Sequence, residues 1–62
     1  MELPPMIGKT PEEARALILA IRPDANIQVL KQNSPVTLDL RFDRVRLFVD
    51  DNGRIADQPR FG

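Results

Sequence analysis

The chain has no cysteine, histidine, tryptophan or tyrosine among its 62 residues. The absence of cysteine excludes a disulfide framework, and because histidine is also missing, the usual ligands of a structural zinc site are lacking. Few groups remain for catalysis, since Ser34 is the one serine and Lys9 and Lys31 are the two lysines. The composition therefore predicts a protein that is not an enzyme and that needs no metal or cofactor.

An excess of charge of one sign is missing as well, because nine basic and nine acidic residues cancel. No net field would gather nucleic acid or acidic lipid headgroups around the molecule. The longest uninterrupted apolar run, residues 16–21, is far shorter than the roughly 20 residues that cross a bilayer. We therefore expect a soluble protein with no nucleic-acid or membrane partner. No secretory signal pattern is visible, so the sequence favours neither a cytoplasmic nor a secreted location.

A chain of this length predicts one domain, residues 1–62, with a single thin core. The start of a helix is marked by Thr10, Pro11 and Glu13, which suit a cap, a first helical position and a capping box. Pro23 predicts that the helix ends near Arg22. The spacing of one apolar helix face is met by four residues, Ala14, Leu17, Ile18 and Ile21.

Two short strands are predicted after the helix, over residues 27–30 and 43–50. Alternation in the second strand separates core-facing aliphatic residues from the opposite face, and these two sets are Val45, Leu47 and Val49 against Arg44, Arg46 and Phe48. Residues 51–53 suit a tight turn that returns residues 54–57 as a short edge strand. One helix with three short strands predicts an α+β domain.

The connection between the strands, residues 33–42, has an unusual composition for a loop. Apolar residues alternate with polar ones along it, in the order Val36, Thr37, Leu38, Asp39, Leu40, Arg41 and Phe42. One interpretation is that residues 36–42 continue the second strand, but a strand of roughly fifteen residues would far exceed the usual five or six. We favour an extended, unpaired segment, which in so small a domain is typical of a functional loop.

An extended, exposed segment is also the shape that proteases bind, because their clefts accept substrate as an added strand. Two runs of the sequence, SPVTLDLR at residues 34–41 and RVRLF at residues 44–48, carry a resemblance to a known family. Further matching pieces occur in the same order: Gly8-Lys9, Glu12-Glu13-Ala14, Arg22-Pro23-Asp24-Ala25, residues 43–50 and Pro59-Arg60-Phe61-Gly62. Together, over residues 7–62, they resemble the potato inhibitor I family of serine-protease inhibitors.

Two features depart from the pattern of that family. Many members carry a tryptophan ahead of the helix, where this chain has Leu3-Pro4-Pro5-Met6, and some members carry a disulfide. Both differences concern the packing of the N-terminal segment, and hence stability, rather than the loop.

The resemblance implies a helix packed on a small sheet with a parallel main pair of strands, an antiparallel C-terminal edge and a long exposed protease-binding loop. The reactive bond would be Leu38–Asp39. The large apolar side chain of Leu38 implies a serine protease with an apolar primary pocket, such as a subtilisin-like, chymotrypsin-like or elastase-like enzyme. The loop that binds this protease would comprise Pro35, Val36, Thr37, Leu38, Asp39, Leu40 and Arg41.

Arg44 and Arg46 would support the loop from below in this family's fold, through charge-assisted bonds to Asp39, Thr37 or nearby carbonyls. The protein would act as a monomer. Other interpretations remain open, because the arginines can also form an ordinary solvated strand face. A non-inhibitory module that docks the same loop to another partner is the alternative function. The carboxylate of Gly62 is a further possible partner for an arginine.

Overall fold

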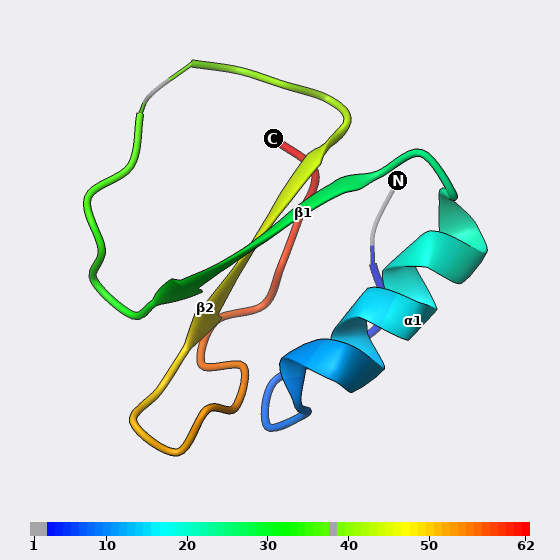
Figure 1. Cartoon of the computed structure of the whole chain (residues 1–62). Helices are drawn as coiled ribbons and strands as arrows, with labels where there is room; N and C mark the ends of the chain where they lie inside the picture. The colour runs from blue at the N-terminus through cyan, green and yellow to red at the C-terminus, as the bar shows by residue number, and fades with distance from the viewer. Residues whose placement is uncertain (1–2, 38) are drawn as a thin grey trace.

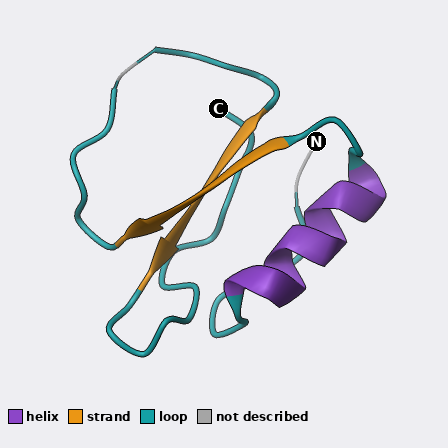
Figure 2. Ribbon diagram, viewed as in Figure 1, coloured by secondary structure: helices purple, strands orange, loops and turns teal. Residues whose placement is uncertain are grey.

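The helix lies on one side of a small parallel sheet, and the long connection between the strands arches out on the other side (Figures 1 and 2). The computed structural model describes residues 3–37 and 39–62, so Leu38 of the predicted reactive bond lies outside the described residues. Helix α1 spans Pro11–Ile21, strand β1 spans Asn26–Lys31 and strand β2 spans Arg44–Val49. The two strands pair in parallel, which confirms the predicted α+β fold.

Helix α1 begins and ends where the sequence predicts. The Thr10 hydroxyl accepts a hydrogen bond from the Glu13 N–H at 3.2 Å, and the Glu13 carboxylate accepts one from the Thr10 N–H at 3.2 Å. These reciprocal bonds satisfy N–H groups at the start of the helix, and the bond from the Thr10 backbone lowers the pKa of Glu13. Arg22 caps the other end, where its N–H donates to the Ile18 carbonyl at 2.8 Å.

The core lies between α1 and one face of the sheet. Its most deeply buried members come from the N-terminal segment, the helix, β2 and the chain after it, and they are Met6, Ala14, Ile18, Val45, Leu47 and Ile55. The predicted helix face is only partly covered, since Leu17 remains 37% exposed and Ile21 39% exposed. A sheet of two strands is too narrow to bury the full apolar width of the helix.

The N-terminal segment is firmly attached despite the missing tryptophan. Met6 is fully buried, and its N–H donates to the side-chain oxygen of Gln58 at 3.0 Å. The side-chain nitrogen of Gln58 donates in turn to the carbonyls of Leu3 and Pro4, at 3.3 and 3.0 Å. One side-chain amide thus closes the N-terminal segment onto the chain near the C-terminus.

The turn after β2 forms as predicted, but the edge strand that follows it is reduced. Gly53 adopts a φ of 75°, and its N–H donates to the Asp50 carbonyl at 3.0 Å. The predicted strand over residues 54–57 shortens to one antiparallel bridge between Val49 and Ile55. The backbone of Ile55 also bonds the N-terminal segment, since its N–H reaches the Lys9 carbonyl at 2.8 Å. Ile55 therefore contacts both β2 and the N-terminal segment, and its chain segment does not pair along the length of β2.

The connection between β1 and β2 stays outside the sheet. Among the residues described, 35–37 and 39–41 belong to neither helix nor strand, so the interpretation that residues 36–42 continue β2 is wrong. The connection begins in a turn at Asn33, which has a φ of 67°, and the Ser34 hydroxyl donates to the Lys31 carbonyl at 2.6 Å. Across residues 3–37 and 39–62, no helix is long and apolar enough to cross a membrane.

Candidate functional site

The predicted loop is exposed wherever the structure describes it. Pro35, Thr37, Asp39 and Arg41 all lie at the surface. The apolar loop residues are exposed too, with Val36 at 39% and Leu40 at 70%. Leu38, the predicted primary specificity residue, falls outside the described part of the chain, but its neighbours on both sides are placed.

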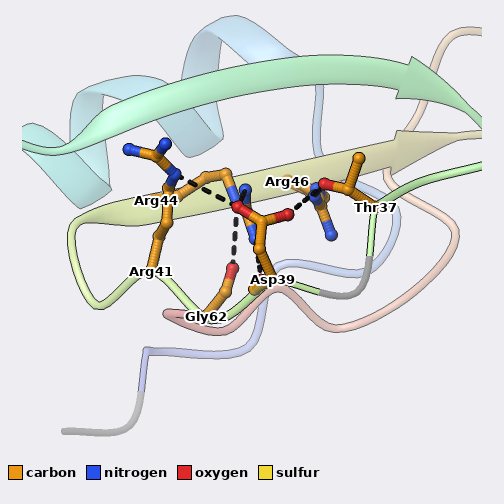
Figure 3. A network of polar contacts seen from close by, with 6 residues as sticks. All are labelled: Thr37, Asp39, Arg41, Arg44, Arg46 and Gly62. Atoms are coloured by element: carbon orange, nitrogen blue, oxygen red, sulfur yellow. Dashed lines mark hydrogen bonds and ion pairs between the residues drawn. The ribbon is translucent and has the colours of Figure 1, made fainter.

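Arg44 is the residue that ties the loop to β2. Only 4% of it is exposed, although it projects from the sheet face opposite the core. Its Nη1 donates to the Asp39 carboxylate at 3.1 Å and its Nη2 to the Asp39 main-chain carbonyl at 2.7 Å (Figure 3). Its Nε donates to the main-chain oxygen of Gly62 at 3.2 Å. One guanidinium therefore holds three acceptors on two separate segments.

Arg46 holds the other side of the predicted bond. Its Nη2 donates to the Thr37 hydroxyl at 3.0 Å, and that hydroxyl donates in turn to the Asp39 carboxylate (Figure 3). Thr37 and Asp39, which flank position 38, are thus joined to each other and to neighbouring arginines of β2. The structure brings together all four residues that the sequence predicts for this support.

The Asp39 carboxylate is the centre of this network. It accepts bonds from the Thr37 hydroxyl, from Arg41 Nε at 3.2 Å and from Arg44. These contacts hold the pKa of Asp39 well below its ordinary value, with the Thr37 hydroxyl contributing most and Arg41 next. Asp39 therefore stays ionised through neutral and mildly acidic conditions, as a charge-assisted support requires.

Gly62 joins the network through its backbone. Its N–H donates to the Arg44 carbonyl at 2.9 Å, while its oxygen accepts from Arg44 Nε. The adjacent Phe61 forms an antiparallel bridge with Val45. Arg44 is thus the arginine that Gly62 contacts, through its main-chain oxygen, and the ion pair expected of the Gly62 carboxylate stays a prediction.

The loop is held above the sheet by hydrogen bonds from side chains and does not pack directly on the sheet. An open hollow of about 650 Å³ lies under the loop, lined by Thr37, Asp39, Arg41 and Arg44 together with Asn26 and Gln28 of β1. The described loop residues are thus connected to the sheet by polar side chains that cross this hollow. In the described part of the chain, no cluster of three acidic side chains is arranged to hold a metal ion.

Two contacts at this site were not predicted from the sequence. Arg41 was expected to face a protease, but its guanidinium also turns back to Asp39 and remains 62% exposed. Arg22 was not expected at the site, and its Nη1 donates to the Phe42 carbonyl at 2.6 Å. No local pattern signals this bond, because it joins residues 20 positions apart.

Comparison with known proteins identifies relatives that match most of the chain. A profile of the potato inhibitor I family matches residues 3–62. Chymotrypsin inhibitor from Lumbricus terrestris is 49% identical over 59 residues, which cover 95% of this chain and 69% of that protein. Eglin C from Hirudo medicinalis is 37% identical over 54 residues, which cover 87% of this chain and 77% of that protein.

The fold is shared with a solved structure as well. The crystal structure of bitter gourd trypsin inhibitor matches with a TM-score of 0.89 and 34% identity, covering 98% of this chain and 90% of that one. The family match and these relatives show that the chain is a protein inhibitor of serine proteases. The chain belongs to the potato inhibitor I family, as the resemblance in its sequence predicted.

Proposed function

We propose that this inhibitor offers its Leu38–Asp39 bond to serine proteases with apolar primary pockets, and that it acts as a monomer in a substrate-like manner. Pro35, Val36, Thr37, Leu40 and Arg41 would complete the surface that the protease contacts. The observation that carries this proposal is that Arg44 donates two hydrogen bonds to Asp39, one to the carboxylate and one to the main-chain carbonyl of Asp39. A backbone fixed before binding loses less conformational entropy when the protease docks.

The same two hydrogen bonds would make hydrolysis of the Leu38–Asp39 bond by the protease slow. The protease serine oxygen attacks the Leu38 carbonyl carbon, the bond from that carbon to the Asp39 nitrogen breaks, and the enzyme's base passes the serine proton to the new amine. Because Arg44 keeps Asp39 in place, this amine stays beside the acyl-enzyme at a high effective concentration. It then attacks the ester and re-forms the peptide bond faster than water hydrolyses the ester.

Specificity in this proposal follows from Leu38. A large apolar side chain fills an apolar primary pocket, whereas the acidic pocket of trypsin favours a cation. The relative from Lumbricus terrestris is named a chymotrypsin inhibitor, which supports a target of the apolar-pocket class.

Titration of subtilisin and chymotrypsin tests the proposal directly. Residual activity should fall linearly to an endpoint of one inhibitor per protease, and mass spectrometry should find a slow, single cut between Leu38 and Asp39. Sedimentation of the free protein should give the mass of one chain. Rapid digestion at several sites without loss of protease activity would instead favour the alternative, a module that docks this loop to a partner without inhibiting it.

A further inference from the structure

Arg22, the residue that caps helix α1, is held by partners from three parts of the chain. Its Nη1 donates to the Phe42 carbonyl at 2.6 Å, and its Nε donates to the Asp24 carboxylate at 3.1 Å. Its guanidinium carbon lies 5.5 Å from the centroid of the Phe61 ring, within the range of a cation–π contact. The direction of the bond to Phe42 is therefore set by two other contacts of the same guanidinium.

Phe42 stands at the point where the loop turns into β2. The turn is closed locally by the Arg44 N–H, which lies 3.4 Å from the Arg41 carbonyl. Beside it, the Asp43 carbonyl accepts from the Asn26 N–H at 2.7 Å, which ties the turn to the start of β1. The bond from Arg22 adds the helix as a third support at this end of the loop.

We infer that Arg22 is a positioning residue for the reactive bond, because it fixes the far end of the segment that carries the new amine after cleavage. The inference rests on the proposed function. Once the bond before Asp39 opens, residues 39–42 are the segment that must stay in place. Arg44 holds the first residue of this segment, and Arg22 holds the last.

At Phe42 the bond from Arg22 adds a restraint to those of the Arg41–Arg44 turn and the Asn26–Asp43 bond, and a more restrained end lets residues 39–42 sample fewer orientations. Residues 39–42 lie outside both strands, so the ladder between β1 and β2 does not restrain them. The Leu40 and Phe42 side chains are each 70% exposed and gain little restraint from packing. Loss of the bond from Arg22 would therefore let the amine drift, lower its effective concentration and favour completed hydrolysis.

The test compares Arg22→Ala with two matched controls, using subtilisin as the protease. Arg15→Ala removes the same charge from an exposed position on α1, and Thr10→Ala removes the cap at the opposite end of that helix. We expect Arg22→Ala to be cleaved about fivefold faster or more, and its final ratio of intact to cleaved chain to fall by a similar factor. Both controls should stay within about twofold of the unaltered protein.

Amide-proton exchange supplies a reading that needs no protease. Exchange of the Arg44 N–H, which closes the turn after Phe42, should accelerate in Arg22→Ala relative to other sheet amides and stay unchanged in the controls. Equal cleavage of Arg22→Ala and the unaltered inhibitor would overturn the role of Arg22 and leave the proposed function intact. An equal acceleration in Thr10→Ala would also overturn it, since general destabilisation would then explain the effect. If the unaltered protein fails to inhibit, the proposed function itself is refuted, which is a distinct result.

Discussion

Arg44 holds Asp39 twice, with one nitrogen on the carboxylate at 3.1 Å and another on the main-chain carbonyl at 2.7 Å. The side-chain contact alone would leave the backbone free to rotate about the bonds of Asp39. The second contact restrains the peptide unit itself, next to the bond that the protease is proposed to attack. Lysine could not reproduce this arrangement, because an ammonium group presents a single point of charge in place of a planar fork.

Arg44→Ala should therefore impair the inhibitor more than Arg46→Ala. The Arg44→Ala variant loses the bonds to Asp39 and Gly62 at a buried position. We therefore expect its free energy of unfolding to fall by about 2 kcal/mol and its cleavage at Leu38–Asp39 to become about tenfold faster. Arg46 makes one bond to Thr37, and within the described residues its Nε has no partner, so a smaller acceleration is expected. Chemical denaturation and timed mass spectrometry measure the two effects.

Arg44→Lys is the matched control for charge. It should recover part of the stability but little of the resistance to cleavage, since it cannot hold the carboxylate and the carbonyl of Asp39 together. Full resistance to cleavage in Arg44→Ala would remove Arg44 from the mechanism.

Replacing Leu38 with arginine should redirect the inhibitor toward trypsin. A cation at the primary specificity position suits an acidic pocket and is poorly accommodated in an apolar one, so the inhibition constant for trypsin should fall by at least about a hundredfold while that for chymotrypsin rises. Leu40→Arg, at an exposed position two residues further on, is the control and should not create this preference. An unchanged profile for Leu38→Arg would place the reactive bond elsewhere.

The Asp39 carboxyl should titrate well below its ordinary value of about 3.9 in the folded protein. Because this pKa is lowered on folding, the stabilising contribution is present above about pH 4 and is lost only as the pH falls through the folded-state pKa. Thr37→Val, which removes the largest cause of the shift, should raise the pKa of Asp39 toward the ordinary value. Carboxyl-carbon NMR titration measures both.

Thr37→Ser keeps the hydroxyl and is the matched control for that titration. It should leave the pKa of Asp39 low, although one methyl group is lost. If Thr37→Val titrates like the unaltered protein, Arg41 and Arg44 alone account for the ionisation of Asp39.

Met6→Ala should separate stability from inhibition. Met6 is fully buried, and removing such a side chain typically costs about 2–5 kcal/mol, a large part of the stability of a small domain. Ile7→Ala, at a neighbouring position that is 65% exposed, should cost less than about 1 kcal/mol. Both variants should inhibit normally at temperatures where they remain folded, because neither side chain belongs to the loop support. A loss of affinity in folded Met6→Ala would contradict this separation.

The sequence predicts best those features that depend on neighbouring residues. The capping box at Thr10 is read from positions three apart, and the shared face of Arg44 and Arg46 follows from the two-residue period of a strand. The partners of these arginines, Thr37 and Asp39, came from family resemblance, since strand periodicity alone does not say what lies above a sheet face.

Several features that depend on how distant segments meet were not predicted. The bond from Arg22 to Phe42 exists only because the helix end and the loop end converge in space. The burial of Ile55 likewise depends on contacts with both β2 and the N-terminal segment. Leu17 is exposed because the sheet is narrow, and the width of the sheet cannot be predicted from the sequence of the helix.

The supports of the loop come from residues that follow it closely in the chain, since Arg44 lies five positions after Asp39 and Arg46 nine positions after Thr37. The ten consecutive codons for residues 37–46 therefore encode both Leu38, the proposed specificity residue, and most of the side chains that support the loop. A combinatorial library at position 38 alone would leave those codons otherwise unchanged. Such variants could be selected for new specificities in bacteria under reducing conditions, because no cystine has to form.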